Sequence, residues 1–341
     1  MRRVVASFAR RERGFETPVN MVNSSDRNDA SERNQVEQSS SLTEAVHPAS
    51  RGLDGLSSRG IVELMHAQDL EVWKALEGAI DVLGEVVDRA VEAYSAGGRV
   101  VYVGAGTSGR LGVLDASECP PTFGVDPDRF VGVIAGGDRA LRESIEGAED
   151  SPDAGAQAMR ALEIDRMDLV CGIAASGSTP YVLGALEEAI ARGAGTALLA
   201  CNRLDESHVA WQLLGRLDHR VELLVGPEII AGSTRMKAGT ATKMALNMIS
   251  TGTMVRVGKV YDNLMVDVVP SNRKHVRRAK HLIMRLADVD ELAAAELLER
   301  SGDNVKIAVL MRRRGLGAPE ARELLERSEG RLKEAMESGD S

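Results

Sequence analysis

The first regular pattern of hydrophobic residues along the chain begins at Ile61 and continues to Tyr94. Apolar side chains recur there every three or four residues, which is the spacing of one face of a helix. Gly97 and Gly98 follow, and paired glycines are typical of a helix C-terminus. The segment therefore predicts two amphipathic helices, or one helix with a break. Residues 1–40 are polar, have no periodic apolar face, and predict a disordered tail.

From residue 100 onward, short apolar runs alternate with stretches of helical spacing. Near-continuous apolar strands separated by helices are typical of a parallel sheet that helices cover on both faces. The predicted fold class is therefore α/β, with a doubly wound, mainly parallel five-stranded sheet flanked by helices. The five strands are expected at residues 100–103, 130–135, 169–174, 196–201 and 221–225.

After the last expected strand, apolar residues occupy most faces of a helical pattern between Ser233 and Val257, which predicts a long buried helix. The pattern changes again beyond Pro270, where apolar residues recur at helical spacing in short stretches. We expect some of them to form the core of a small three-helix bundle. The shorter helices are expected at residues 273–286, 289–300, 304–314 and 318–325.

These changes of pattern divide the chain into four parts. We expect a tail over residues 1–40, an N-terminal helical segment over 41–95, a domain built on the sheet over 96–258, and a C-terminal helical region over 259–341. Hydrophobic residues make up 43% of the chain and aromatic residues only 3%, and there are 34 glycines. This composition suits a core of small aliphatic side chains with many tight loops.

The balance of charge restricts the kinds of partner. The 341 residues include 42 Lys and Arg against 51 Asp and Glu, a net charge of −9. Binding to nucleic acid requires a basic surface, so this balance argues against nucleic acid as the main partner. A small anionic ligand, held by a few local donors, remains compatible with it.

Several features predict a cytoplasmic protein without a membrane partner. No apolar stretch reaches the roughly 18 residues that a membrane span requires. The N-terminus carries arginines but no apolar core of a secretory signal. Cys119, Cys171 and Cys201 have no metal-ligand spacing, and the last two lie in apolar runs, so we expect reduced, buried thiols.

The strand expected at 100–103 runs directly into a loop that is rich in glycine and hydroxyl groups, Gly104-Ala-Gly-Thr-Ser-Gly-Arg110. Its glycine spacing matches the dinucleotide-binding fingerprint, which by itself is a weak signal. Thr107 and Ser108 lie in the turn, and hydroxyl groups at a helix N-terminus suit a terminal phosphate better than a pyrophosphate. The loop predicts a phosphate site, with a dinucleotide site as the alternative.

A second loop repeats this arrangement after the third expected strand. It contains Ser176, Gly177, Ser178 and Thr179, followed by Pro180, a residue well tolerated at a helix start. Open α/β sheets bind ligands at the carboxyl ends of parallel strands, where both loops would lie. The alternative for each loop is an ordinary turn whose Ser or Thr caps the next helix.

A third cluster opens the long helix. Ser233 and Lys237 lie there with further hydroxyl and cationic side chains, so free N–H groups, the helix dipole and positive charge would together favour an anion. The alternative is a capped helix with solvated cations. In the whole chain no His, Asp or Glu cluster has metal-ligand spacing, so no metal site is predicted.

These stretches resemble the sugar isomerase domain and are most similar to the bacterial N-acetylmuramic acid 6-phosphate etherase family. The resemblance extends from about Leu42 to the C-terminus. Isomerase relatives share the hydroxyl-rich loops but lack the block Ser117-Glu-Cys-Pro-Pro121. The family usually has Arg where this chain has Ser178. The resemblance is carried by residues 104–124, 146–150, 226–247 and 263–269.

The resemblance implies an enzyme that converts N-acetylmuramic acid 6-phosphate and water to N-acetylglucosamine 6-phosphate and D-lactate, in the metabolism of cell-wall sugars. It also implies a homodimer without metal or organic cofactor, and an active site near the subunit interface. The family's two functional glutamates match Glu118 and Glu149. An aldose–ketose isomerase, a non-catalytic sugar-phosphate sensor and a dinucleotide-dependent dehydrogenase remain as alternatives.

The position of Glu118 raises a geometric question. A helix from Ser108 to Ser117 would carry it about 15 Å from the phosphate loop, too far to act on the same hexose. Cys119-Pro120-Pro121 follows and is expected to be a rigid exit from the helix. Either the helix ends early, or the chain folds back, or Glu118 serves the site of a partner subunit.

Overall fold

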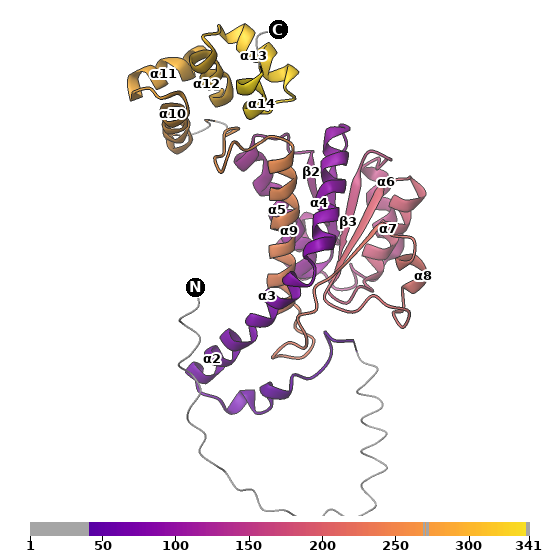
Figure 1. Cartoon of the computed structure of the whole chain (residues 1–341). Coiled ribbons are helices and arrows are strands. Elements are labelled where there is room, and N and C mark those ends of the chain that lie inside the picture. Colours follow the sequence, from indigo (N-terminus) through magenta and orange to yellow (C-terminus); the bar gives the residue numbers. More distant parts are fainter. Residues whose placement is uncertain (1–40, 269, 271–272, 339–341) are drawn as a thin grey trace, which may run out of the picture. The chain divides into compact units, whose positions relative to one another are not determined.

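The structure is a computed structural model that describes residues 41–268, 270 and 273–338 (Figure 1). The tail expected over residues 1–40 lies outside the described residues. The division of the chain into four parts stays a prediction.

The central element is a five-stranded sheet in the order β2-β1-β3-β4-β5. Every pair of neighbouring strands is parallel, and Val100 of β1 is aligned with Phe130 of β2 and Leu169 of β3. The predicted fold class is confirmed, and the sheet is parallel throughout. The strands are β1 (Val100–Gly104), β2 (Phe130–Ile134), β3 (Leu169–Ile173), β4 (Gly195–Ala200) and β5 (His219–Glu222).

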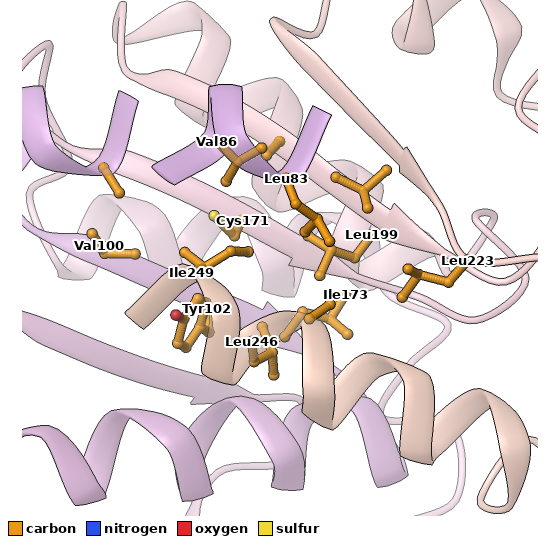
Figure 2. Close-up of a cluster of buried hydrophobic side chains, with 14 of the residues drawn as sticks. Leu83, Val86, Val100, Tyr102, Cys171, Ile173, Leu199, Leu223, Leu246 and Ile249 are labelled. Carbon is orange, nitrogen blue, oxygen red and sulfur yellow. The ribbon is translucent and has the colours of Figure 1, made fainter. Parts of the chain in front are cut away.

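Alternating side chains of the strands enter two different cores. Val100 and Tyr102 of β1 point to one face, where α4 (Ile80–Ser95), α5 (Gly106–Phe123) and α9 (Lys237–Arg256) pack (Figure 2). Val101 and Val103 point to the other face and meet helices α6 (Pro152–Ala161), α7 (Pro180–Ala191) and α8 (Trp211–Leu214). The period of two along each strand thus builds a core on each side of the sheet.

The N-terminal apolar pattern forms three helices, where two helices or one broken helix were expected. They are α2 (Ser58–Gln68), α3 (Leu70–Glu77) and α4, and the breaks are at Asp69 and at Gly78-Ala79. The long helix α9 also begins four residues later than expected, because residues before Lys237 form an irregular loop.

The C-terminal helices are α10 (Arg273–Ala287), α11 (Glu291–Arg300), α12 (Val305–Arg314), α13 (Ala318–Arg327) and α14 (Leu332–Glu337). All five contribute to a third hydrophobic core, including α14, which the sequence pattern did not single out. Among the described residues, no helix has the length and apolarity of a membrane span.

All three cysteines are buried free thiols, as the sequence predicts. Cys171 lies in β3, Cys119 in α5, and Cys201 directly after β4. Burial raises the pKa of each thiol to about 12.

Glycine allows α5 to approach the sheet unusually closely. A Cβ atom at Gly109 would lie 2.6 Å from Ile134 Cγ1 and 2.7 Å from the carbonyl oxygen of Gly104. Any side chain at this position would push the first turn of α5 away from β1 and β2.

We therefore expect Gly109→Ala to lower the free energy of unfolding by about 1–3 kcal/mol, the usual effect of overpacking. Gly84→Ala is the matched control, because Gly84 lies exposed in the interior of α4 with no atom within 4 Å of its Cβ position. This second variant should gain about 1 kcal/mol from helix propensity. Urea unfolding measures both, and equal effects of the two substitutions would contradict the packing argument.

Candidate active site

The first hydroxyl-rich loop connects β1 to α5 at the carboxyl edge of the sheet. Thr107 and Ser108 are half-buried in the first turn of α5. The N-cap residue, Ala105, makes no side-chain capping bond, so the turn is not closed in the way the ordinary-turn alternative requires. Thr107 also packs toward α9, since its methyl carbon would lie 3.5 Å from a Cβ atom at Gly239. The first and third clusters are therefore neighbours.

The second loop, between β3 and α7, is organised by its own hydroxyl groups. The Ser176 side chain accepts hydrogen bonds from the Ser178 backbone N–H (3.1 Å) and from the Ser178 hydroxyl group (3.0 Å). Gly177 has a φ of +77°, in the left-handed region that favours glycine. Thr179 is the N-cap of α7 and, like Ala105, makes no side-chain capping bond. The start of α7 therefore also lacks a side-chain cap.

The third cluster differs, because an internal carboxylate already occupies the start of α9. Glu228 is 1% exposed, and its Oε1 accepts a hydrogen bond from the backbone N–H of Ala238 (2.9 Å). Lys237 is 3% exposed, and burial lowers its pKa, although the negative charges of Glu228 and Glu71 oppose this. Ser233 lies in the loop before the helix. The contact of Ser233 and Lys237 with a ligand stays a prediction.

Glu149 is exposed and lines a hollow of about 290 Å³ that adjoins the first loop. Gly106 and Arg110 of α5 line this hollow together with Glu146 and Glu149. The backbone carbonyl of Glu149 accepts a hydrogen bond from the N–H of Tyr181, in the first turn of α7 (3.0 Å). The structure thus brings Glu149 next to both of the helix starts that lack a side-chain cap.

Comparison with known proteins identifies the family of this chain. A family model described as the glucokinase regulatory protein N-terminal SIS domain matches residues 82–190. A Synechocystis protein named N-acetylmuramic acid 6-phosphate etherase is 49% identical over 297 residues, which cover 87% of this chain and 95% of that protein. The chain belongs to the N-acetylmuramic acid 6-phosphate etherase family.

Other members support the same assignment over nearly their whole lengths. The etherase from Crocosphaera subtropica is 47% identical over 87% of this chain and 96% of its own. The etherase from Klebsiella aerogenes is 42% identical over 88% of this chain and 98% of its own. The resemblance seen in the sequence is confirmed.

In this member of the etherase family, Glu118 lies far along α5 from the loop. The helix does not end at Pro120 and Pro121, so the expected exit there is wrong, and it continues to Phe123 before Gly124 terminates it with a φ of +62°. The prolines cost two helical hydrogen bonds but do not redirect the chain. Glu118 is twelve residues after Gly106 in the sequence, a rise of about 18 Å along the helix. Glu118 is exposed in the single chain.

Two residues near the etherase-family loops escaped the sequence analysis. Asn202 and His208 both contact the carbonyl oxygen of Ser176, from Nδ2 at 3.2 Å and from Nε2 at 3.1 Å. Asn202 follows β4 at the carboxyl edge of the sheet. A polar residue at this position could have been predicted to lie near the site. His208 lies in an irregular loop and carried no local signal.

A buried carboxylate joins α5 to α9. Asp115 Oδ1 accepts hydrogen bonds from Asn247 Nδ2 (2.6 Å) and from the Ser250 hydroxyl group (3.1 Å). The other oxygen, Oδ2, and the Tyr102 hydroxyl group are buried and make no hydrogen bond of good geometry, although Tyr102 is near enough to Asp115 to oppose the rise of its pKa. Burial raises the pKa of Asp115 above its ordinary value, which means that its charge costs stability at neutral pH.

The sign of this effect gives a test. Between its unfolded and folded pKa values, Asp115 binds more protons in the folded chain, so its contribution to stability falls as pH rises through that interval. Asp115→Asn keeps the acceptor oxygen and removes the charge, so we expect about 1 kcal/mol higher stability at pH 7. The gain should shrink as pH falls toward 4. Urea unfolding across this range measures it, with exposed Asp54→Asn as the control, and a less stable variant at pH 7 would refute the assignment.

Proposed function

We propose that this chain cleaves the D-lactyl ether of N-acetylmuramic acid 6-phosphate to give N-acetylglucosamine 6-phosphate and D-lactate. The observation that carries this proposal is the placement of Glu149 beside two helix starts without side-chain caps, in a chain that belongs to the etherase family. The small-molecule partner would be a phosphosugar, and the proposed setting is the cytoplasm, which suits three reduced thiols.

The 6-phosphate would bind between the first turns of α5 and α7. The first turn of α5 has backbone N–H groups without a side-chain cap. The first turn of α7 offers fewer, because Pro180 has no N–H and the N–H of Tyr181 donates to the Glu149 carbonyl. Both turns present the positive end of a helix dipole, which favours an anion. Hydroxyl groups add donors that reach the phosphate oxygens. Ser233 and Lys237 would approach from the start of α9. The residues proposed for the two loops are Thr107, Ser108, Ser176, Gly177, Ser178 and Thr179.

The chemistry requires one base, one acid and water. In the open-chain aldehyde the C1 carbonyl acidifies the C2 proton, which a carboxylate removes. The lactyl oxygen then leaves C3 with a proton from a second carboxyl group, and a C2–C3 double bond forms. Water adds back at C3, with a proton returning to C2. No net oxidation or reduction occurs, so the proposal requires no redox cofactor. Each proton transfer is worth about 10²–10⁴-fold in rate.

Glu149 is proposed as the base at C2, and Glu118 as the acid for the lactyl oxygen. Because Glu118 lies about 18 Å along α5 from the loop of its own chain, it would act in the site of a partner subunit. The chain has apolar surface for such a homodimer: α2 buries none of its residues, and Val62, Leu70 and Trp73 are 63%, 64% and 68% exposed.

Product analysis tests the reaction and the two roles. The parent should release D-lactate from N-acetylmuramic acid 6-phosphate. Glu118→Gln should lose about 10²–10⁴-fold in lactate release yet still exchange the C2 proton with deuterated water, whereas Glu149→Gln should lose both. Exposed Glu187→Gln in α7 is the control and should resemble the parent. Exchange lost only in Glu118→Gln would reverse the roles, and a ketose product without lactate would indicate an isomerase.

Mixed dimers test whether Glu118 crosses to the partner. A dimer of one Glu118→Gln subunit and one Glu149→Gln subunit would contain one intact site and one site lacking both groups. We expect about half of the parent activity from mixed dimers isolated with two different tags. Differently tagged dimers of a single variant are the controls and should stay inactive. Inactive mixed dimers would place both glutamates in one chain, and failure to form dimers would refute the shared site.

A further inference from the structure

Residues 41–43, which precede the first helices, contact the loop before α9 directly and the second hydroxyl-rich loop through Asn202. The Thr43 carbonyl accepts a hydrogen bond from the N–H of Gly232, in the loop before α9 (3.1 Å). The Thr43 hydroxyl group lies 2.6 Å from that of Ser41, and Thr43 is only 2% exposed. We call residues 41–43 the strap. Ser41 is exposed, so the buried Thr43 is the residue that fixes the strap against the carboxyl edge of the sheet.

Asn202 joins the strap to the second loop. Its Nδ2 lies within hydrogen-bonding distance of three acceptors: the Ser41 hydroxyl group, the Thr43 hydroxyl group at 3.3 Å and the Ser176 carbonyl oxygen at 3.2 Å. Asn202 is 4% exposed, so water offers few alternative partners. The amide nitrogen therefore depends on the strap and the loop for its hydrogen bonds.

His208 contacts the same carbonyl oxygen. Its Nδ1 accepts a hydrogen bond from the N–H of Ala210 (3.2 Å), which assigns the ring proton to Nε2. Nε2 then donates to the Ser176 carbonyl oxygen at 3.1 Å. A Cβ atom at Gly177 would lie 2.7 Å from Leu204 Cδ2 and 3.0 Å from His208 Nε2, so the loop packs directly on this support.

We propose that the strap and Asn202 position the second loop for binding of the phosphate group. Within the loop, the Ser176 hydroxyl group is engaged by Ser178, whereas the Ser176 carbonyl oxygen receives the two side-chain donors from outside. Without the strap, the amide of Asn202 loses two acceptors and is free to rotate away from the loop. Asn202 and Thr43 are thus positioning residues that act through Ser176. The inference rests on the proposed phosphosugar site.

The test compares variants of nearly equal shape in the full chain. Thr43→Val removes the hydroxyl group, and Asn202→Asp replaces the donating nitrogen by an oxygen that repels the Ser176 carbonyl. Each should weaken binding of N-acetylglucosamine 6-phosphate, measured by calorimetry, by about tenfold. KM for N-acetylmuramic acid 6-phosphate should rise to a similar extent, with kcat within about twofold. Thr43→Ser, which keeps the hydroxyl group, should restore the parent values.

Ser207→Ala is the matched control in the His208 loop, because the Ser207 hydroxyl group donates only to the exposed Asp205 (2.6 Å). It should bind like the parent. Parent-like binding by both Thr43→Val and Asn202→Asp would overturn the proposal, as would a loss of kcat and thermal stability with KM unchanged. A parent chain that binds the phosphosugar in this strap-dependent way but releases no D-lactate would refute the proposed reaction alone. A parent that binds no phosphosugar would refute both.

Discussion

The close packing of α5 on the sheet is the interaction on which the candidate site depends. Because Gly104 and Gly109 lack side chains, the helix backbone touches β1, and Ile134 of β2 fills the remaining space. This contact holds the first turn of α5 at the carboxyl edge of the sheet. Arg110 then spans to the backbone carbonyls of Leu141 and Glu143, on the rim of the hollow that contains Glu149. The position of the hollow is thus a consequence of backbone packing.

The three helix starts that the sequence presented as similar turn out to be chemically different. α5 and α7 begin without a side-chain cap, whereas at the start of α9 the buried Glu228 accepts a hydrogen bond from the N–H of Ala238. A helix N-terminus attracts anions through its free N–H groups and its dipole. A carboxylate of the chain itself, bound at that position, takes the place of an external anion. The starts of α5 and α7 are therefore better placed to bind a phosphate group than the start of α9, where a carboxylate of the chain itself is already bound. Glu228 is ten residues from its partner Ala238, too far for a local capping pattern.

The sheet was predictable because its strands are nearly continuous apolar runs. Four of the five begin and end within one residue of the expected limits, and β5 is displaced because the ladder ends at Glu222 while Leu223 and Val225 remain buried beyond it. Predictions from local sequence were wrong where contacts between distant residues determine the structure. The expected helix end at Pro120 is wrong, because α5 is held on both sides of the prolines by Asp115 and by the buried Phe123. The loops were found from their composition, but the partners of Ser176 come from sites 26 and 32 residues away.

The buried cysteines make local unfolding of this domain measurable. All three thiols lie in the core on one face of the sheet, but on different elements: Cys171 in β3, Cys119 in α5, and Cys201 directly after β4. With pKa values near 12 and no access to solvent, these thiols react with alkylating reagents only when their surroundings separate. The order in which they become reactive records which of these three elements separates from the shared core first. The chain therefore carries three intrinsic reporters of local unfolding, and no label has to be added.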